Sequence, residues 1–82
     1  MIENFPVYRK YSNNKNYFKI ISFKEFYEIL FIGKKIILKK FEAKIYPDKL
    51  FIVDLINCNS QIIEIFKEEF TQIESQISTE LE

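Results

Sequence analysis

The sequence predicts a small α+β domain in which an antiparallel sheet is covered by a C-terminal amphipathic helix. Three observations predict this fold. Two segments rich in aromatic and β-branched residues flank a polar turn near the N-terminus, and a third such segment covers residues 35–46. Isoleucine and phenylalanine then recur at helical spacing after residue 61. With 82 residues there is room for one domain, which we expect to span residues 1–82 and to fray at 78–82.

The first two strands are expected at residues 5–11 and 17–22. Between them lies the polar cluster Ser12-Asn13-Asn14-Lys15-Asn16, in which asparagine tolerates a positive φ. A strand, a polar turn and a second strand are typical of an antiparallel hairpin.

Residues 23–32 fit two structures. Ser22 and Glu25 have the spacing of a capping box, and apolar residues follow on one helical face. These are Phe23, Phe26, Tyr27, Leu30 and Phe31. The continuous apolar run that ends at Gly33-Lys34 fits instead one strand of a second hairpin, over residues 27–46.

The strand at residues 35–46 is the clearest of the three. One face holds Ile37, Phe41, Ala43 and Ile45, although Lys39 interrupts this apolar row. Pro47 then fits either the first turn of a helix that runs to Asn57 or a turn before a strand over residues 50–56. The sequence is therefore consistent with either a helix or a strand for residues 48–57.

The last element is an amphipathic helix that starts near either Ser60 or Phe66. Its charged face includes Glu64, Lys67, Glu68 and Glu74. Its apolar face holds Ile62, Ile63, Phe66, Phe70, Ile73 and Ile77.

Composition excludes several classes of protein. The chain is 48% hydrophobic and 17% aromatic, which excludes a disordered chain. Cys58 is the single cysteine and there is no histidine, so an internal disulfide and a Cys/His zinc site are excluded. Without an imidazole base or a glycine-rich phosphate loop, we expect no enzymatic activity, no cofactor and no metal. Asp54 interrupts an apolar run and is either a surface carboxylate or one paired with a lysine or tyrosine.

The same features indicate a reducing compartment. One cysteine in 82 residues is usual for a cytoplasmic protein, and the N-terminus lacks the basic and apolar regions of a signal peptide. The longest uncharged apolar run, residues 29–32, is far short of the ~20 residues that span a bilayer. We therefore expect a cytoplasmic protein without a membrane partner.

Charge is distributed unevenly along the chain. The 12 basic and 12 acidic residues give a net charge of zero. Residues 1–49 nevertheless carry 11 basic and 5 acidic side chains, whereas residues 50–82 carry 1 and 7. The basic half interleaves lysines with aromatic rings in the first hairpin. The candidate binding residues are therefore Tyr8, Arg9, Tyr11, Tyr17 and Lys19.

Short apolar motifs over residues 17–70 resemble a small uncharacterised bacterial protein family. The matching pieces include Tyr17-Phe18-Lys19-Ile20, Ile32-Gly33-x-Lys35, Ala43-Lys44-Ile45-x-Pro47-Asp48 and Ile52-x-Asp54-Leu55-Ile56. Similar sequences often have a polar residue near Leu30, which favours the hairpin for residues 27–32. The resemblance implies no known activity, so no site residue follows from it.

Two functions are consistent with these observations. The leading hypothesis is a non-enzymatic protein-interaction module that binds a protein partner or a second copy of itself. The alternative is a weak single-stranded nucleic-acid binder that uses the basic aromatic hairpin. Because the net charge is zero and only one of the basic residues is arginine, a nucleic-acid partner is the less favoured of the two.

Overall fold

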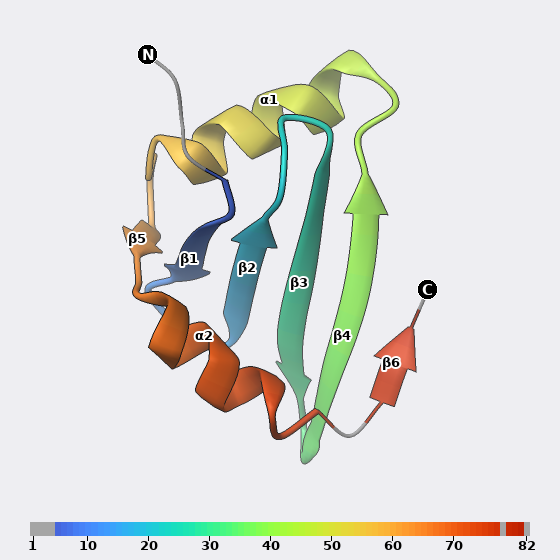
Figure 1. Cartoon of the computed structure of the whole chain (residues 1–82), viewed down its shortest axis with the longest axis vertical. Helices are drawn as coiled ribbons and strands as arrows, with labels where there is room; N and C mark the ends of the chain where they lie inside the picture. The colour runs from blue at the N-terminus through green and yellow to red at the C-terminus, as the bar shows by residue number, and fades with distance from the viewer. Residues whose placement is uncertain (1–4, 78, 82) are drawn as a thin grey trace.

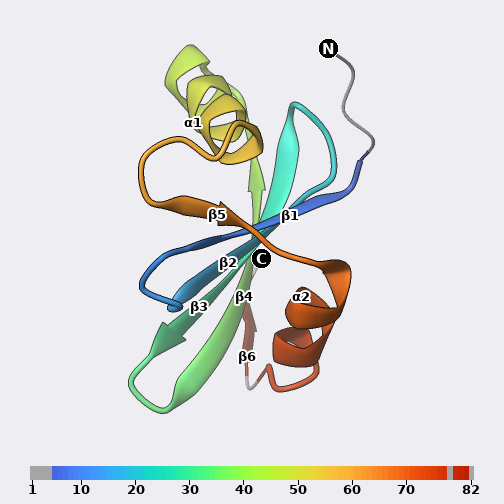
Figure 2. The ribbon, with the colours of Figure 1, turned by 90° about the vertical axis from the view of Figure 1, so that its left-hand side faces the viewer.

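The computed structural model places a six-stranded sheet between two helices, one on each face (Figure 1; Figure 2). It describes residues 5–77 and 79–81, the last three by their backbone only. In chain order the elements are β1 (Val7–Tyr11), β2 (Asn16–Ile20), β3 (Glu25–Ile32), β4 (Lys35–Glu42), α1 (Tyr46–Ile56), β5 (Ile62–Glu64), α2 (Lys67–Glu74) and β6 (Thr79–Leu81). The predicted α+β class with a small antiparallel sheet is confirmed.

The strand order across the sheet is β5-β1-β2-β3-β4-β6. Neighbours from β5 to β4 are antiparallel, and β6 lies parallel to β4. The backbone of β6 thus joins the sheet within the range that was expected to fray, while Ser78 and Glu82 lie outside the described residues. The strand predicted for residues 35–46 ends at Glu42.

Local side-chain chemistry sets the turns. Asn14 has a φ of 61°, and the Asn13 side chain accepts a hydrogen bond from the Lys15 backbone N–H at 2.8 Å. Gly33 has a φ of 57° at the first position of the two-residue loop between β3 and β4, where a positive φ is typical of a type II′ turn. These positions explain why polar and glycine residues interrupt the strands there.

Residues 23–32 form a strand and turn rather than a helix. The apolar spacing was ambiguous because β3 buries side chains on both of its faces, with Phe26 on one and Ile29 on the other. Ser22 does accept hydrogen bonds from the backbone N–H groups of Lys24 and Glu25. It does so in a turn before β3, so the capping-box spacing marks a turn and not a helix start.

Residues 46–56 take the helical alternative, with Pro47 in the first turn. The C-terminal helix begins after Phe66, the later of its two expected starts. Residues 62–64 form β5 instead, a strand that was not predicted. β5 pairs with β1, which would otherwise be an open edge of the sheet.

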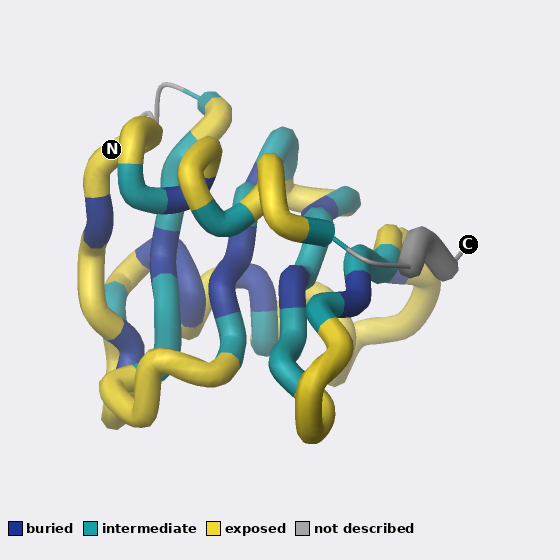
Figure 3. Tube along the Cα trace, turned by 90° about the horizontal axis from the view of Figure 1, so that it is seen from below, coloured by how far each residue is buried: buried dark blue, intermediate teal, exposed yellow. Residues whose placement is uncertain are grey.

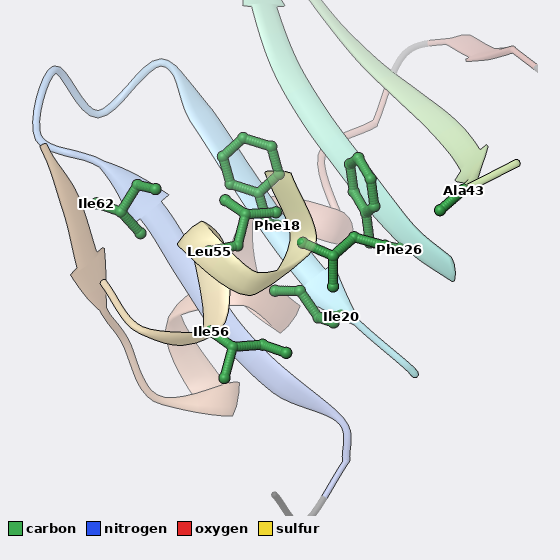
Figure 4. Packing of buried hydrophobic residues seen from close by; sticks show 8 residues of the cluster. Phe18, Ile20, Phe26, Ala43, Leu55, Ile56 and Ile62 are labelled. Carbon is green, nitrogen blue, oxygen red and sulfur yellow. The ribbon is translucent and has the colours of Figure 1, made fainter. Parts of the chain in front are cut away.

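Each face of the sheet has its own apolar cluster. On the first face, strand residues such as Phe18, Ile20 and Phe26 pack with Ile52, Leu55 and Ile56 of α1 (Figure 4). On the second face, Tyr17 of β2 and Ile29 of β3 pack with Ile65 and with Phe70 of α2. Figure 3 shows buried and half-buried residues along the strands and exposed residues at the turns.

Candidate interaction surface

The five candidate binding residues do not share one surface. Successive residues of a strand point to opposite faces of the sheet. Tyr8 and Tyr17 therefore belong to the cluster around α2, whereas Tyr11 packs in the cluster around α1. Arg9 is directed to α1, and Lys19 lies opposite Tyr8 and is half-buried. A binding role for these residues stays a prediction.

Arg9, the one arginine of the chain, connects β1 to the end of α1 through hydrogen bonds. Its side chain is 7% exposed. Nε donates to the Leu55 carbonyl and Nη2 to the Ile56 carbonyl, both at 2.9 Å, and Nη1 donates to the Tyr8 carbonyl at 2.8 Å. The last carbonyls of a helix have no intrahelical partner, and a cation there also meets the negative end of the helix dipole. The planar fork of arginine suits two adjacent carbonyls in a way that lysine does not.

The tyrosine rings pack against phenylalanines. Tyr8 lies 5.4 Å from Phe70 between ring centroids, and Tyr11 lies 5.1 Å from Phe18. Burial, and then the negative charge of Glu28, raise the pKa of the Tyr11 hydroxyl above its ordinary value. These rings are core residues at least in part, so they offer little free face for stacking.

The uneven charge along the chain is partly neutralised inside the molecule. Lys10 of β1 forms a salt bridge of 2.9 Å with Glu69 of α2, and Arg9 lies 4.0 Å from Glu64 of β5. Basic strand residues thus meet acidic residues of the C-terminal segment across the fold. Part of the net charge of +6 on residues 1–49 and of −6 on residues 50–82 is therefore used in ion pairs that join the C-terminal segment to the sheet.

Two hollows flank α1. One has a volume of about 210 Å³ and is lined by the rings of Phe26, Phe41 and Phe51, by the carboxylates of Glu28, Glu42 and Asp48, and by Ala43. The other, of about 430 Å³, is lined mostly by polar side chains, which are Asn13, Asn59, Ser60 and Gln61 of loops and Asp54 of α1. The first is smaller than a typical pocket for a small molecule, and neither is lined by a cysteine or a histidine.

Asp54 and Cys58 lie near the C-terminal end of α1. Asp54 is exposed and accepts a hydrogen bond from Asn59 Nδ2 at 2.9 Å, so it is a surface carboxylate, and among the described residues no lysine or tyrosine is bonded to it. Cys58 is a half-buried free thiol. Within the described part of the chain, no group of three acidic, cysteine or histidine side chains could hold a metal ion. Across the same residues, no helix is long and apolar enough to cross a membrane.

The outer side of α1 is the surface that the sequence reasoning missed. Tyr46 is 71% exposed, Leu50 46% and Val53 39%. The three residues recur at i, i+4 and i+7, so they form one apolar line along the helix, which we call the α1 outer stripe. The other side of the same helix packs into the core through Ile52, Leu55 and Ile56.

A helix that is apolar on both sides is normally buried on both sides. The signal was present in the sequence, because residues 50–56 are all apolar except Asp54, so a helix over this segment has no single polar side. It was overlooked since the segment had two possible structures, and an outer face exists only in the helical one. The α1 outer stripe is therefore the candidate interaction surface.

Comparison with protein-family models, curated proteins and solved structures finds no match to this chain. The resemblance to a small bacterial family over residues 17–70 stays a prediction, and the site rests on the geometry described above.

Proposed function

We propose that this chain is a non-enzymatic protein-interaction module that binds through the α1 outer stripe. The observation that carries the proposal is the exposure of Tyr46, Leu50 and Val53 on a helix whose opposite side already packs in the core. Removing such side chains from water is favourable by roughly 25 cal/mol per Å² of apolar area, and this gain must exceed the entropy cost of association. The free Cys58 is compatible with a cytoplasmic module.

Binding of single-stranded nucleic acid through the first hairpin is less well supported. It needs exposed rings beside cations, but Tyr17 is 6% exposed and Arg9 is bound to the end of α1.

Exchanging Leu50 for aspartate tests the proposed function, because it places a charge in the centre of the stripe. The matched control is Ile63→Asp on β5, whose side chain is 43% exposed and lies off the stripe. Self-association is measured by sedimentation, and capture of partners from a cell extract is compared between wild type and both variants. Association or capture that Leu50→Asp removes and Ile63→Asp retains supports the proposal. A monomeric wild type whose captured proteins are unchanged by Leu50→Asp overturns it.

A further inference from the structure

We propose that the partner of the α1 outer stripe is a second copy of this chain, with the two α1 helices side by side and parallel. The inference rests on the proposed function and adds the identity and orientation of the partner.

The residues of the α1 outer stripe are regularly spaced. Tyr46, Leu50 and Val53 of α1 and the exposed Asn57, which caps the C-terminal end of this helix, are separated by four, three and four residues. This is the spacing of the two apolar positions in a heptad repeat, which brings two helices together along a narrow seam. A polar asparagine at one such position is a known device for fixing the register of a pair.

A charged residue lies on either side of the stripe. Lys49 immediately precedes Leu50, and Asp54 immediately follows Val53. These are the positions that flank the seam of a two-helix pair and choose its orientation. Both residues are exposed, and Asp54 lies in the last helical turn, where an acid is unfavourable to the helix dipole. Within its own chain Asp54 accepts a hydrogen bond from Asn59 Nδ2, at 2.9 Å from Oδ1, and its exposed carboxylate still carries a charge beside the stripe.

The two charges complement each other between copies only when the helices are parallel. In a parallel pair, the residue before Leu50 faces the residue of the partner copy that is five positions further along the chain. Lys49 of each copy therefore faces Asp54 of the other copy, which gives two ion pairs related by the two-fold axis. In an antiparallel pair the equivalent flanks face each other, which brings lysine near lysine and aspartate near aspartate. The charge pattern selects the parallel arrangement.

The rest of the fold permits this arrangement. Because Ile52, Leu55 and Ile56 hold α1 to the sheet on the side away from the stripe, the two sheets lie on opposite sides of the helix pair. The stripe contains three apolar side chains, so we expect an interface smaller than the ~800 Å² per partner of a stable complex. We therefore expect a weak dimer, and the experiment is designed for a dissociation constant of about 0.1 to 1 mM.

Charge exchange tests the orientation. Lys49→Asp and Asp54→Lys each replace two attractions by two repulsions, and each weakens association by about tenfold in low salt. The double variant with both exchanges restores the wild-type constant to within about threefold, because the pairs re-form with reversed sign. Lys34→Asp, in the exposed β3–β4 loop, is the control for a change in net charge and leaves association unchanged. Sedimentation equilibrium gives the constants, and circular dichroism checks that each variant folds.

The outcomes separate this inference from the proposed function. Weakening in both single variants and recovery in the double variant supports the parallel dimer. Association that Leu50→Asp removes but that the charge exchanges do not alter overturns the orientation and leaves the proposed function standing. A wild-type chain that stays monomeric at about 1 mM overturns the second copy as partner, and the extract comparison then decides the proposed function by itself.

Discussion

Replacing Arg9 by lysine removes the fork that holds the end of α1. The two carbonyls that it binds belong to Leu55 and Ile56, and the Arg9 residue is 6% exposed, so water cannot readily replace the lost donors. A lysine ammonium in the same place reaches at most one of the two carbonyls. The other carbonyl is then left without a donor, and the buried ammonium forms fewer hydrogen bonds than the guanidinium did. Together these losses lower the unfolding free energy by about 2–3 kcal/mol.

That loss is large for this chain, since 82 residues correspond to a total stability of roughly 4–12 kcal/mol. Urea unfolding followed by circular dichroism measures it. With a denaturant slope of about 1 kcal/mol per molar urea, the midpoint of Arg9→Lys falls by about 2–3 M. Lys34→Ala, in an exposed turn, is the control and stays within about 0.5 kcal/mol of wild type. An Arg9→Lys midpoint equal to that of the control would refute the role assigned to the guanidinium.

Three further predictions concern the core, the second hairpin and the first strand. Phe70→Ala removes a ring that is 1% exposed and lowers the unfolding free energy by about 3–5 kcal/mol. The control Phe66→Ala, at a position that is 82% exposed, changes it by less than about 0.5 kcal/mol. Equal losses for the two variants in urea unfolding would contradict the placement of α2. Gly33→Ala costs about 1 kcal/mol in the same assay and Gly33→Asn costs less, because a Cβ at Gly33 meets no atom within 4 Å and the cost comes from the φ of +57° alone; an equal cost for both would argue against a backbone origin. Because the pKa of Tyr11 is raised in the folded state, the folded chain binds more protons than the unfolded chain above about pH 10. Stability is therefore unaffected by this group below about pH 10 and falls as pH rises towards the folded-state pKa; Tyr11→Phe makes that alkaline decline shallower, and an unchanged slope in pH-dependent unfolding would contradict the assignment.

The sequence predicted the elements better than it predicted their surfaces. The two hairpins, the helix opened by Pro47 and the C-terminal helix were all among the expected structures. Short polar and glycine turns mark these boundaries locally, as at Asn14 and Gly33, so no knowledge of distant contacts is needed to find them.

The faces of the sheet could not be assigned in the same way. A sheet with a helix on each side buries side chains on both of its faces, so the alternation of residues along a strand does not separate core from surface. For this reason Tyr17 looked like a binding residue although it is buried, and Arg9 looked like part of a basic patch although it holds α1. β5 was missed because its three residues continue the apolar periodicity of the helix that follows it.

The α1 outer stripe was missed for a related reason. Its residues are apolar, and an apolar helix residue is expected in the core unless the fold shows that the opposite side is already packed. Only the contacts of Ile52, Leu55 and Ile56 with the sheet identify Tyr46, Leu50 and Val53 as outward-facing.

The parallel pairing of two α1 helices is the central claim, and cross-linking at Tyr46 tests it most directly. In a Cys58→Ser background, Tyr46→Cys places one thiol at the start of the stripe, and mild oxidation followed by mass measurement detects a disulfide-linked dimer. In the parallel pair the two side chains at position 46 face each other, and their Cα atoms lie within the separation that a disulfide allows, about 4.4–6.8 Å. In an antiparallel pair they lie about 16 Å apart along the helix axis. A linked dimer that forms with Tyr46→Cys, but not with Ile63→Cys or after Leu50→Asp is added, is the predicted result. No linked dimer from Tyr46→Cys, or an equal yield from Ile63→Cys, would contradict the account.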